Sequence, residues 1–557
     1  MDKRFARLLA LSIFSTALAL AQPVIGGAAV NSASYRTPGM PGSGVAQGSI
    51  FIVFGTGLGP ASLVEAAAFP LQTTLGGTSV SVTVGDAQES AFIVYTYNYG
   101  VAAILPSTTP LGSGTFTVTY NGQISAPAPI QVVAAAFGIY TVNEAGSGQA
   151  IATDINYAIN TIVHTFHPGD YATLWGTGLG AITGSDAEAP PLGNLPGPIT
   201  VYVGASAAPV VTYHGRSPGF AGLDQIDFQI PAGVTGCYVP VAVQAGGTLG
   251  NVGNITTIAV SDSGQTCSDS VMAQDLVNQL AAGQTVDFGY IRLESWVARY
   301  TPDSAGNATL DYGIATFSQY TPQNAGLAQY GVSSGYCVAV DCSTECGGAN
   351  LAGFSLSDSS PAQLDAGTLS VQFGPDVTLT QSQYQSGFYD GVLSGSTGRY
   401  LFSALTYPVV GTGGSAVGQF TVNDVTSIPS ATLAGLTNAQ NVPVSGDLML
   451  QWTGGNPALQ NGQVTISAQS VNQSADDTYL AEFLQCTAPV SAQQFTIPAW
   501  VLSALPPSSS FTVDEQTIPQ GWIQVGQYNK PTAFNATGLT SGLITDIFYN
   551  GIGVYFQ

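Results

Sequence analysis

The sequence predicts an all-β protein built from tandem β-sandwiches, with few short helices. First, the 557 residues include 68 Gly and 32 Pro but only 9 Lys and Arg, a composition poor in helix formers and rich in turn formers. Second, apolar and polar residues alternate, as at Val80, Val82 and Val84, which is the period of a half-buried strand. Third, the chain is too long for one hydrophobic core, so we expect several domains.

The charge balance argues against two classes of partner. Nine Lys and Arg face 32 Asp and Glu, which gives a formal net charge of −23. Binding to nucleic acid or to an anionic membrane requires clustered cations. We therefore expect neither as a partner.

Residues 1–21 have the features of a signal peptide. Lys3, Arg4 and Arg7 precede an apolar run from Leu8 to Leu20. This run is shorter than the ~20 residues needed to cross a bilayer, and we find no later stretch that qualifies as a span. Small residues at the end of the run suit signal peptidase, so we expect cleavage near Ala21. The sequence thus predicts a secreted protein, extracellular or at the cell surface.

Two repeats follow, over residues 22–135 and 136–266. The segment Phe51–Gly59, which ends in Gly-Thr-Gly-Leu-Gly, recurs as Ala172–Gly180, at a period of about 120 residues. A period this long indicates two complete domains rather than a solenoid. Several short strands separated by Gly and Pro predict a two-sheet sandwich for each domain.

The motifs of these repeats resemble a known family. Asn31-Ser-Ala-Ser-Tyr35, Gly-Thr-Gly-Leu-Gly and the segment Gly222–Gly233 are similar to the IPT/TIG-type immunoglobulin-like repeat of secreted acidobacterial proteins whose role is unknown. The resemblance covers residues 28–262, as two copies, and implies an extracellular sandwich module. The first copy has apolar residues where the second has Gln225 and Asp227, so any role of that polar pair is not shared.

The rest of the chain divides into three predicted segments. Residues 267–283 have helical spacing and form a connecting helix that ends at Gly283. Residues 284–430 form a β-rich domain, and residues 431–557 form a C-terminal immunoglobulin-like sandwich. A second short helix is expected at 499–505, between Pro498 and Pro506.

The six cysteines are expected to form disulfides, because an exported protein meets an oxidising compartment. Cys237 and Cys267 flank the last strand of the second repeat and are expected to pair. The other four allow three pairings, of which we favour a local bridge within residues 337–346 and one that reaches Cys486. A metal cluster is the alternative reading of these four. They are Cys337, Cys342, Cys346 and Cys486.

Residues suited to catalysis are few. Gly176-x-Gly178-x-x-Ala181 matches a dinucleotide fingerprint, but no helix is expected after it, so a tight turn is the better interpretation. Hydrolysis of glycosides needs two nearby carboxylates, and nothing in the sequence pairs any two. The conceivable carboxylates are Asp287, Glu294, Asp365, Asp390 and Glu482. We expect no cofactor; calcium is conceivable but has no loop motif.

Aromatic residues give the remaining indication of function. Tyr95, Tyr97 and Tyr99 alternate along a predicted strand, so their rings share a face and can stack on a sugar or pack together. We expect a secreted binding, adhesion or scaffolding protein that recognises a glycan or a protein through sandwich loops and faces. The alternative is a carbohydrate-active or other hydrolytic domain in residues 284–557. A purely structural matrix role and the oligomeric state stay open.

Overall fold

A computed structural model describes most of the chain. The described ranges are 22–267, 272–299, 307–324, 331–343, 361–373, 376–382, 387–393, 406–425, 431–459, 462–473, 479–513 and 515–557. The predicted signal peptide lies outside them. The fold is all-β, as the composition predicts, and carries the short helices α1 (Gln274–Ala281) and α2 (Ala499–Leu502). These helices fall in the two segments where the sequence predicts them. No helix within these ranges is long and apolar enough to cross a membrane.

Repeat 1 (residues 22–135) folds as a sandwich of two sheets. The first sheet contains β1 (Val24–Ile25), β2 (Val30–Asn31), β4 (Ile50–Thr56), β5 (Val64–Glu65), β8 (Phe92–Tyr97) and β9 (Gly100–Ile104). The second contains β3 (Val45–Ala46), β6 (Thr78–Val84), β7 (Ala87–Ser90), β10 (Gly112–Tyr120), β11 (Gln123–Ile124) and β12 (Ala128–Val133). Phe51 and Val53 from the first sheet pack with Val82 and Phe116 from the second, which forms one core.

Repeat 2 (residues 136–266) repeats this arrangement. Its first sheet contains β13 (Gly138–Ile139), β15 (Ala152–Thr153), β16 (Tyr171–Thr177), β19 (Val211–Arg216) and β20 (Asp224–Gln229). Its second contains β14 (Gly148–Gln149), β17 (Ile199–Val203), β18 (Ser206–Ala207), β21 (Gly236–Ala245) and β22 (Thr256–Val260), with a 3-10 turn at Leu249–Asn251. The order β16-β20-β19 matches β4-β9-β8 of repeat 1. The two sequence repeats are therefore two copies of one sandwich.

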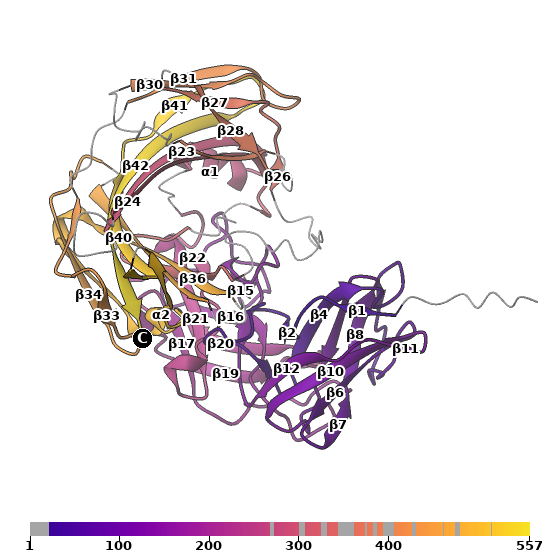
Figure 1. The fold of residues 1–557 in the computed structure, drawn as a ribbon. Helices are drawn as coiled ribbons and strands as arrows, with labels where there is room; N and C mark the ends of the chain where they lie inside the picture. Colours follow the sequence, from indigo (N-terminus) through magenta and orange to yellow (C-terminus); the bar gives the residue numbers. More distant parts are fainter. Residues whose placement is uncertain are drawn as a thin grey trace, which may run out of the picture.

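The rest of the chain is dominated by one 15-stranded sheet. Before residue 430 it contains β23 (Val286–Arg299), β24 (Asn307–Tyr320), β25 (Cys337–Asp341), β26 (Ala362–Gln363), β27 (Leu369–Gln372), β28 (Asp376–Gln381), β29 (Phe388–Val392), β30 (Thr406–Gly411) and β31 (Phe420–Val425). After residue 430 it contains β33 (Gln440–Val442), β35 (Gln463–Gln473), β36 (Tyr479–Pro489), β40 (Gly521–Tyr528), β41 (Thr532–Phe534) and β42 (Ser541–Phe556). The sheet bends into an arc (Figure 1).

This sheet contains strands from both sides of the domain boundary that we expected near residue 430. β42 pairs in parallel with β23, from Phe288 opposite Ser541 to Arg299 opposite Ile552. β25 likewise pairs with β36. Strands from residues 284–430 and 431–557 therefore belong to one sheet instead of forming two separate ones, because β36, β35, β40 and β42 lie between β25 and β23.

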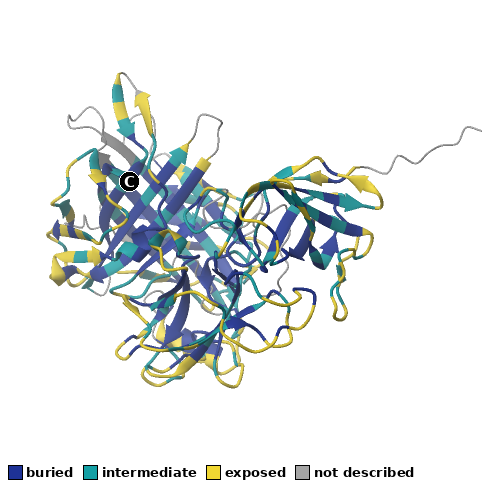
Figure 2. Ribbon diagram, turned by 90° about the horizontal axis from the view of Figure 1, so that it is seen from below, coloured by how far each residue is buried: buried dark blue, intermediate teal, exposed yellow. Residues whose placement is uncertain are grey.

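Smaller elements cover one side of the sheet. They are β32 (Thr432–Ala434), β34 (Leu448–Thr453), β37 (Gln494–Ile497) and a 3-10 turn at Val490–Ala492. The hairpin β38 (Ser510–Val513) and β39 (Gln516–Pro519) forms a separate two-stranded sheet. Leu450, Trp452 and Ile497 from these elements pack with Ile466 and Ile523 of the large sheet. Figure 2 shows the buried residues along the strands and the exposed ones mainly in loops and at strand ends.

The three parts are fixed to one another by buried contacts. Between the repeats, the Arg216 guanidinium pairs with Asp224 and donates to the carbonyl of Gly48 at 2.8 Å. Between repeat 2 and the large sheet region, the rings of Tyr202 and Trp500 stack with centroids 4.9 Å apart. The molecule is therefore a set of docked modules rather than a loose string.

Candidate ligand-binding face

The two sides of β23 differ in chemistry. Ile291 and Leu293 point to one side and belong to a hydrophobic core. Since successive side chains of a strand alternate, Arg292 and Glu294 point to the other side. Phe288, on that second side, packs with helix α1, and Figure 1 draws α1 on the inner side of the arc. The polar side of β23 therefore faces inward.

Residues directly opposite each other in paired strands share a face, so the registers extend this surface over neighbouring strands. We name it the aromatic face. Its members include Tyr290, Arg292, Glu294, Trp296, Tyr312, Asp390, Gln469, Phe483, Trp522, Tyr528 and Tyr549.

Aromatic rings form a continuous cluster on this face. The ring centroids of Trp296 and Trp522 are 5.9 Å apart, and Phe483 extends the row at 6.2 Å from Trp522. Tyr549 meets Trp296 edge-on at 6.2 Å. Gly526 makes room for this cluster, because a Cβ there would lie 2.6 Å from the Tyr549 ring. Trp296, Trp522 and Phe483 are half-buried, so part of each ring stays accessible.

Polar groups hold the two tryptophans in place. The indole N–H of Trp296 donates to Glu294 Oε2 at 2.8 Å, and that of Trp522 donates to Gln469 Oε1 at 3.1 Å. Glu294 Oε1 also forms an ion pair with Arg292 Nε at 2.5 Å. Burial alone lowers the pKa of Arg292, but Glu294 and the neighbouring phenols raise it well above its ordinary value. The face therefore combines fixed rings with a neutralised ion pair.

Two of the conceivable catalytic carboxylates lie on this face. Tyr312, opposite Glu294, donates a hydrogen bond to Asp390 Oδ2. Burial and this hydrogen bond raise the pKa of Tyr312, and the charge of Glu294 adds to the effect. The phenol therefore stays protonated beside both carboxylates.

The other three carboxylates lie elsewhere. Asp287 is on the opposite side of β23, where Gln319 donates to it at 2.8 Å. Asp365 accepts hydrogen bonds from the backbone and side chain of Ser415, which lower its pKa. Glu482 is buried against Arg36. Within the described ranges, no group of three or more His, Cys, Asp or Glu side chains is arranged to hold a metal ion.

Tyr95, Tyr97 and Tyr99 do not form an exposed platform. Tyr97 is only 3% exposed, and the ring centroids of Tyr95 and Tyr99 lie 6.4 Å and 6.3 Å from it. Tyr99, which is 43% exposed, lies beyond the end of β8. Burial raises the pKa of Tyr95, and the phenols of Tyr35, Tyr97 and Tyr140 add to this rise. The alternation therefore marks packing against neighbouring rings.

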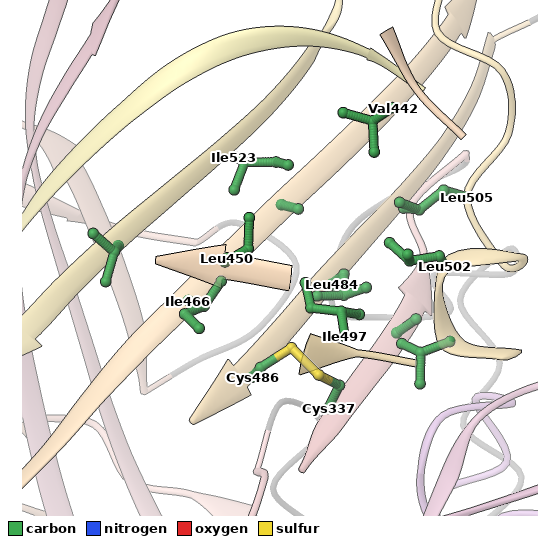
Figure 3. Packing of buried hydrophobic residues seen from close by; sticks show 14 of the residues in the cluster. Cys337, Val442, Leu450, Ile466, Leu484, Cys486, Ile497, Leu502, Leu505 and Ile523 are labelled. Carbon is green, nitrogen blue, oxygen red and sulfur yellow. A yellow bond between two sulfur atoms is a disulfide. The ribbon is translucent and has the colours of Figure 1, made fainter. Parts of the chain in front are cut away.

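Two disulfides lie within the described residues. Cys237 and Cys267 are bonded, as we expected. Cys337 pairs with Cys486, which lies directly opposite it in β25 and β36, and the bond is embedded in the apolar cluster of Figure 3. This is the expected bridge that reaches Cys486. Cys342 is also disulfide-bonded, whereas Cys346 lies outside the described residues.

Sequence reasoning missed the aromatic face. Trp296 and Trp522 are separated by more than two hundred residues, and only the pairing of β23, β42 and β40 brings them together. The alternation of Tyr290, Arg292, Glu294 and Trp296 was the available signal, since it predicts one strand face with polar and aromatic side chains.

Comparisons with known sequences assign this chain to no family. No protein-family model matches the chain. No curated protein sequence matches it either. The expected relation to IPT/TIG-type repeats and to an acidobacterial family therefore stays a prediction.

Solved structures give low-scoring similarities. The chain is similar to domains 5–6 of the S-layer protein SbsC, with 16% identity, 43% of this chain and 100% of that chain covered, and a TM-score of 0.16. It is similar to SGBP-B of a Bacteroides ovatus mixed-linkage glucan utilization locus, in complex with a heptasaccharide, with 10% identity, 79% and 85% covered, and a TM-score of 0.12. It is also similar to SGBP-B from a Bacteroides uniformis xyloglucan utilization locus, with 10% identity, 96% and 100% covered, and a TM-score of 0.15. Scores this low carry no argument about function.

Proposed function

We propose that this protein is a non-enzymatic binding protein of the cell exterior that holds a glycan on its aromatic face. The observation that carries this proposal is the row of Phe483, Trp522 and Trp296, whose rings adjoin on one side of a rigid sheet. Aromatic side chains offer large, amphipathic contact area to the C–H faces of sugars. The partly exposed Gln469, which also accepts the indole N–H of Trp522, supplies an amide group for hydrogen bonds to sugar hydroxyls.

The location at the cell exterior rests on two features. The sequence of residues 1–21 predicts export, and the disulfides Cys237–Cys267 and Cys337–Cys486 suit an oxidising compartment. The net charge of −23 disfavours anionic partners, because clustered cations would be needed to hold them.

A binding screen tests the proposal. The mature chain is run through native gels that contain xyloglucan, galactomannan, hydroxyethylcellulose or polygalacturonate, and retardation is converted to a dissociation constant. We expect at least one neutral polysaccharide to bind. Trp522→Ala should weaken this binding about tenfold or more, since it removes the central ring of the row.

A matched control separates binding from general surface change. Phe511→Ala removes another aromatic ring of the same part of the chain, 46% exposed on the β38–β39 hairpin, and should leave retardation unchanged. Thermal unfolding of each variant shows whether the fold persists. Absence of retardation by every polysaccharide, or equal retardation of Trp522→Ala and wild type, contradicts the proposal.

Hydrolysis is the second candidate, and Tyr312 favours it. The phenol donates to Asp390 and lies opposite Glu294 in the sheet, so two carboxylates share this face, and glycoside hydrolysis uses a pair of carboxylates. The same polysaccharides are incubated with the chain and assayed for new reducing ends. Turnover that Glu294→Gln abolishes would replace the binding assignment with a hydrolytic one.

A further inference from the structure

Both repeats carry the same aromatic pair at the same place. In repeat 1, Tyr35 contacts Phe54, the residue before Gly-Thr-Gly-Leu-Gly; in repeat 2, Tyr157 contacts Trp175, which precedes the same motif. Each pair has its ring centroids 6.3 Å apart and its planes inclined by 31°. Both tyrosines have positive φ, 52° and 63°. The aromatic pair therefore has the same geometry in both copies of the module.

In repeat 1 the protein itself covers this pair. The phenol of Tyr140, from repeat 2, shares a 2.8 Å hydrogen bond with Ser32. Gly146 approaches so closely that a Cβ there would lie 2.2 Å from the carbonyl oxygen of Ser34. Burial raises the pKa of Tyr35, and the adjoining Tyr140 and Glu144 raise it further. The first pair thus serves as a packing surface between the repeats.

In repeat 2 the corresponding pair is open. Tyr157 is 73% exposed, and its neighbour Ile155 is 85% exposed. The equivalent tyrosine of repeat 1, Tyr35, is half-buried, because the segment of residues 140–146 packs against residues 32–34 beside it. An aromatic surface that the chain covers in one copy is therefore left available in the other.

The open copy also differs in its polar groups. Opposite Phe54 and Ile52 in repeat 1 stand Gly100 and Ala102. Opposite Trp175 and Thr173 in repeat 2 stand Gln225 and Asp227, the polar pair that the first copy lacks.

These polar groups are held in a fixed arrangement. Thr173 Oγ1 donates to Asp227 Oδ1 at 2.7 Å, and Gln225 Nε2 donates to the same carboxylate at 3.0 and 3.1 Å. Tyr213 lies opposite Asp227 on the next strand. A packing surface in repeat 1 has thus become a hydrogen-bonding surface in repeat 2.

We propose that this repeat-2 face, formed by Tyr157, Thr173, Trp175, Tyr213, Gln225 and Asp227, binds a neutral saccharide. The exposed ring of Tyr157 and the half-buried ring of Trp175 provide the stacking surface. The oxygens of Asp227 and Gln225 accept hydrogen bonds from sugar hydroxyls. These six residues carry a carboxylate and no cation, so a charged, anionic sugar is repelled and a neutral one is selected. This inference rests on the proposed glycan binding and adds a second site to it, in a different module.

Retardation in the same gels, run with the full mature chain, tests the site. We expect Tyr157→Ala to raise the dissociation constant for the bound neutral polysaccharide about tenfold. Because its side chain is mostly exposed, this change should leave the thermal unfolding midpoint unaltered. Asp227→Ala and Gln225→Gly, which install the repeat-1 residues, should weaken binding further. Phe220→Ala, which removes a 61% exposed ring from repeat 2 outside this face, is the matched control.

Each outcome separates this site from the proposed function. Loss of binding in Tyr157→Ala but not in Phe220→Ala supports the site. Unchanged binding in Tyr157→Ala, with loss in Trp522→Ala, overturns the repeat-2 site and leaves the proposed function intact. No binding by any polysaccharide overturns both. Retardation by polygalacturonate alone, or a protein ligand whose binding Tyr157→Ala abolishes, overturns the assignment of a neutral saccharide.

Discussion

At the scale of single residues, the buried pair Arg36–Glu482 joins repeat 1 to strand β36 of the large sheet. The Arg36 guanidinium lies 3.3 Å from Glu482 Oε1 and donates to the carbonyl oxygens of Pro41 and Ala504 at 2.7 and 3.2 Å. Burial raises the pKa of Glu482 from 4.5 to about 8, although Arg36 opposes this rise and Asp341 adds to it. Glu482 Oε2 has no hydrogen-bond partner among the described residues.

This raised pKa predicts a pH dependence of stability. The folded chain binds the Glu482 proton more tightly than the unfolded chain, so its contribution is full below about pH 4.5 and is lost as pH rises toward about 8. The unfolding midpoint of Glu482→Gln should therefore fall less between pH 5 and about 8 than that of the wild type. Glu65→Gln, which changes an exposed carboxylate, is the control. Parallel pH profiles for Glu482→Gln and the wild type would contradict the assignment.

Removal of the cation alone should be costly. With a pKa of about 8, Glu482 is mostly protonated at pH 7, so Arg36→Ala removes the donor to the carbonyl oxygens of Pro41 and Ala504 rather than exposing a bare charge. Leaving a buried acceptor unsatisfied typically costs ~1–3 kcal/mol. The double variant Arg36→Met with Glu482→Leu replaces both polar side chains with apolar ones of similar volume and should recover part of that loss. Urea unfolding at pH 7 measures both. Arg36→Ala as stable as the wild type would show that the Arg36–Glu482 pair does not hold the segment of residues 36–41 against the large sheet.

At the scale of elements, the two Gly-Thr-Gly-Leu-Gly turns have their backbone N–H groups hydrogen-bonded in different ways. In repeat 2, Asp224 Oδ2 accepts the backbone N–H of Gly178 and Leu179 at 2.7 and 2.8 Å. In repeat 1, the carbonyl oxygen of Asn98 accepts the N–H of Leu58 instead, at 3.0 Å. The described residues 178–198, between β16 and β17, contain no helix, so the interpretation as a tight turn holds and the dinucleotide fingerprint does not.

The two turns provide a matched pair of glycines. Gly178 has φ of 117°, and a Cβ there would lie 2.1 Å from the carbonyl oxygen of Ala136. Gly57, at the same motif position, has φ of 69° and open space around it, with the nearest atom 3.9 Å away. Gly57→Ala should therefore cost only the ~1–2 kcal/mol of a left-handed residue, whereas Gly178→Ala should cost clearly more. Thermal unfolding compares them, and equal losses would contradict the close approach.

The pattern of each repeat was sufficient to predict its strands but not what covers them. Period-two alternation places Tyr95 and Tyr97 on a strand, yet only the folded chain shows that Tyr97 is 3% exposed and lies between the rings of Tyr95 and Tyr99. The same limit applied to Tyr35, whose cover comes from Tyr140, about a hundred residues later. Alternation identifies which side chains share a strand face, but tertiary packing decides which residues cover that face.

At the scale of the whole molecule, the parallel pairing of β23 with β42 decides the architecture. It joins Phe288 to Ser541, so the last strand of the chain completes a sheet that begins more than two hundred residues earlier. Strand periodicity carries no information about such distant partners. For this reason the sequence predicted the β class of residues 284–557 but placed a domain boundary at 430 where the sheet is continuous.

The aromatic face depends on this long-range pairing. Trp296 stands on β23, Tyr549 on β42 and Trp522 on β40, and these strands are neighbours in the sheet. The proposed binding function is thus a consequence of the whole fold rather than of a local motif.

Intrinsic tryptophan fluorescence tests the central claim most directly. Trp452 and Trp500 are buried, at 2% and 4% exposure, so in a Trp175→Phe variant Trp296 and Trp522 are the tryptophans placed to report a ligand on the aromatic face. We expect a saturable change in emission when a bound neutral polysaccharide is added, with the midpoint that gel retardation gives. Retardation of that variant without any change in emission would show that the ligand binds away from the aromatic face.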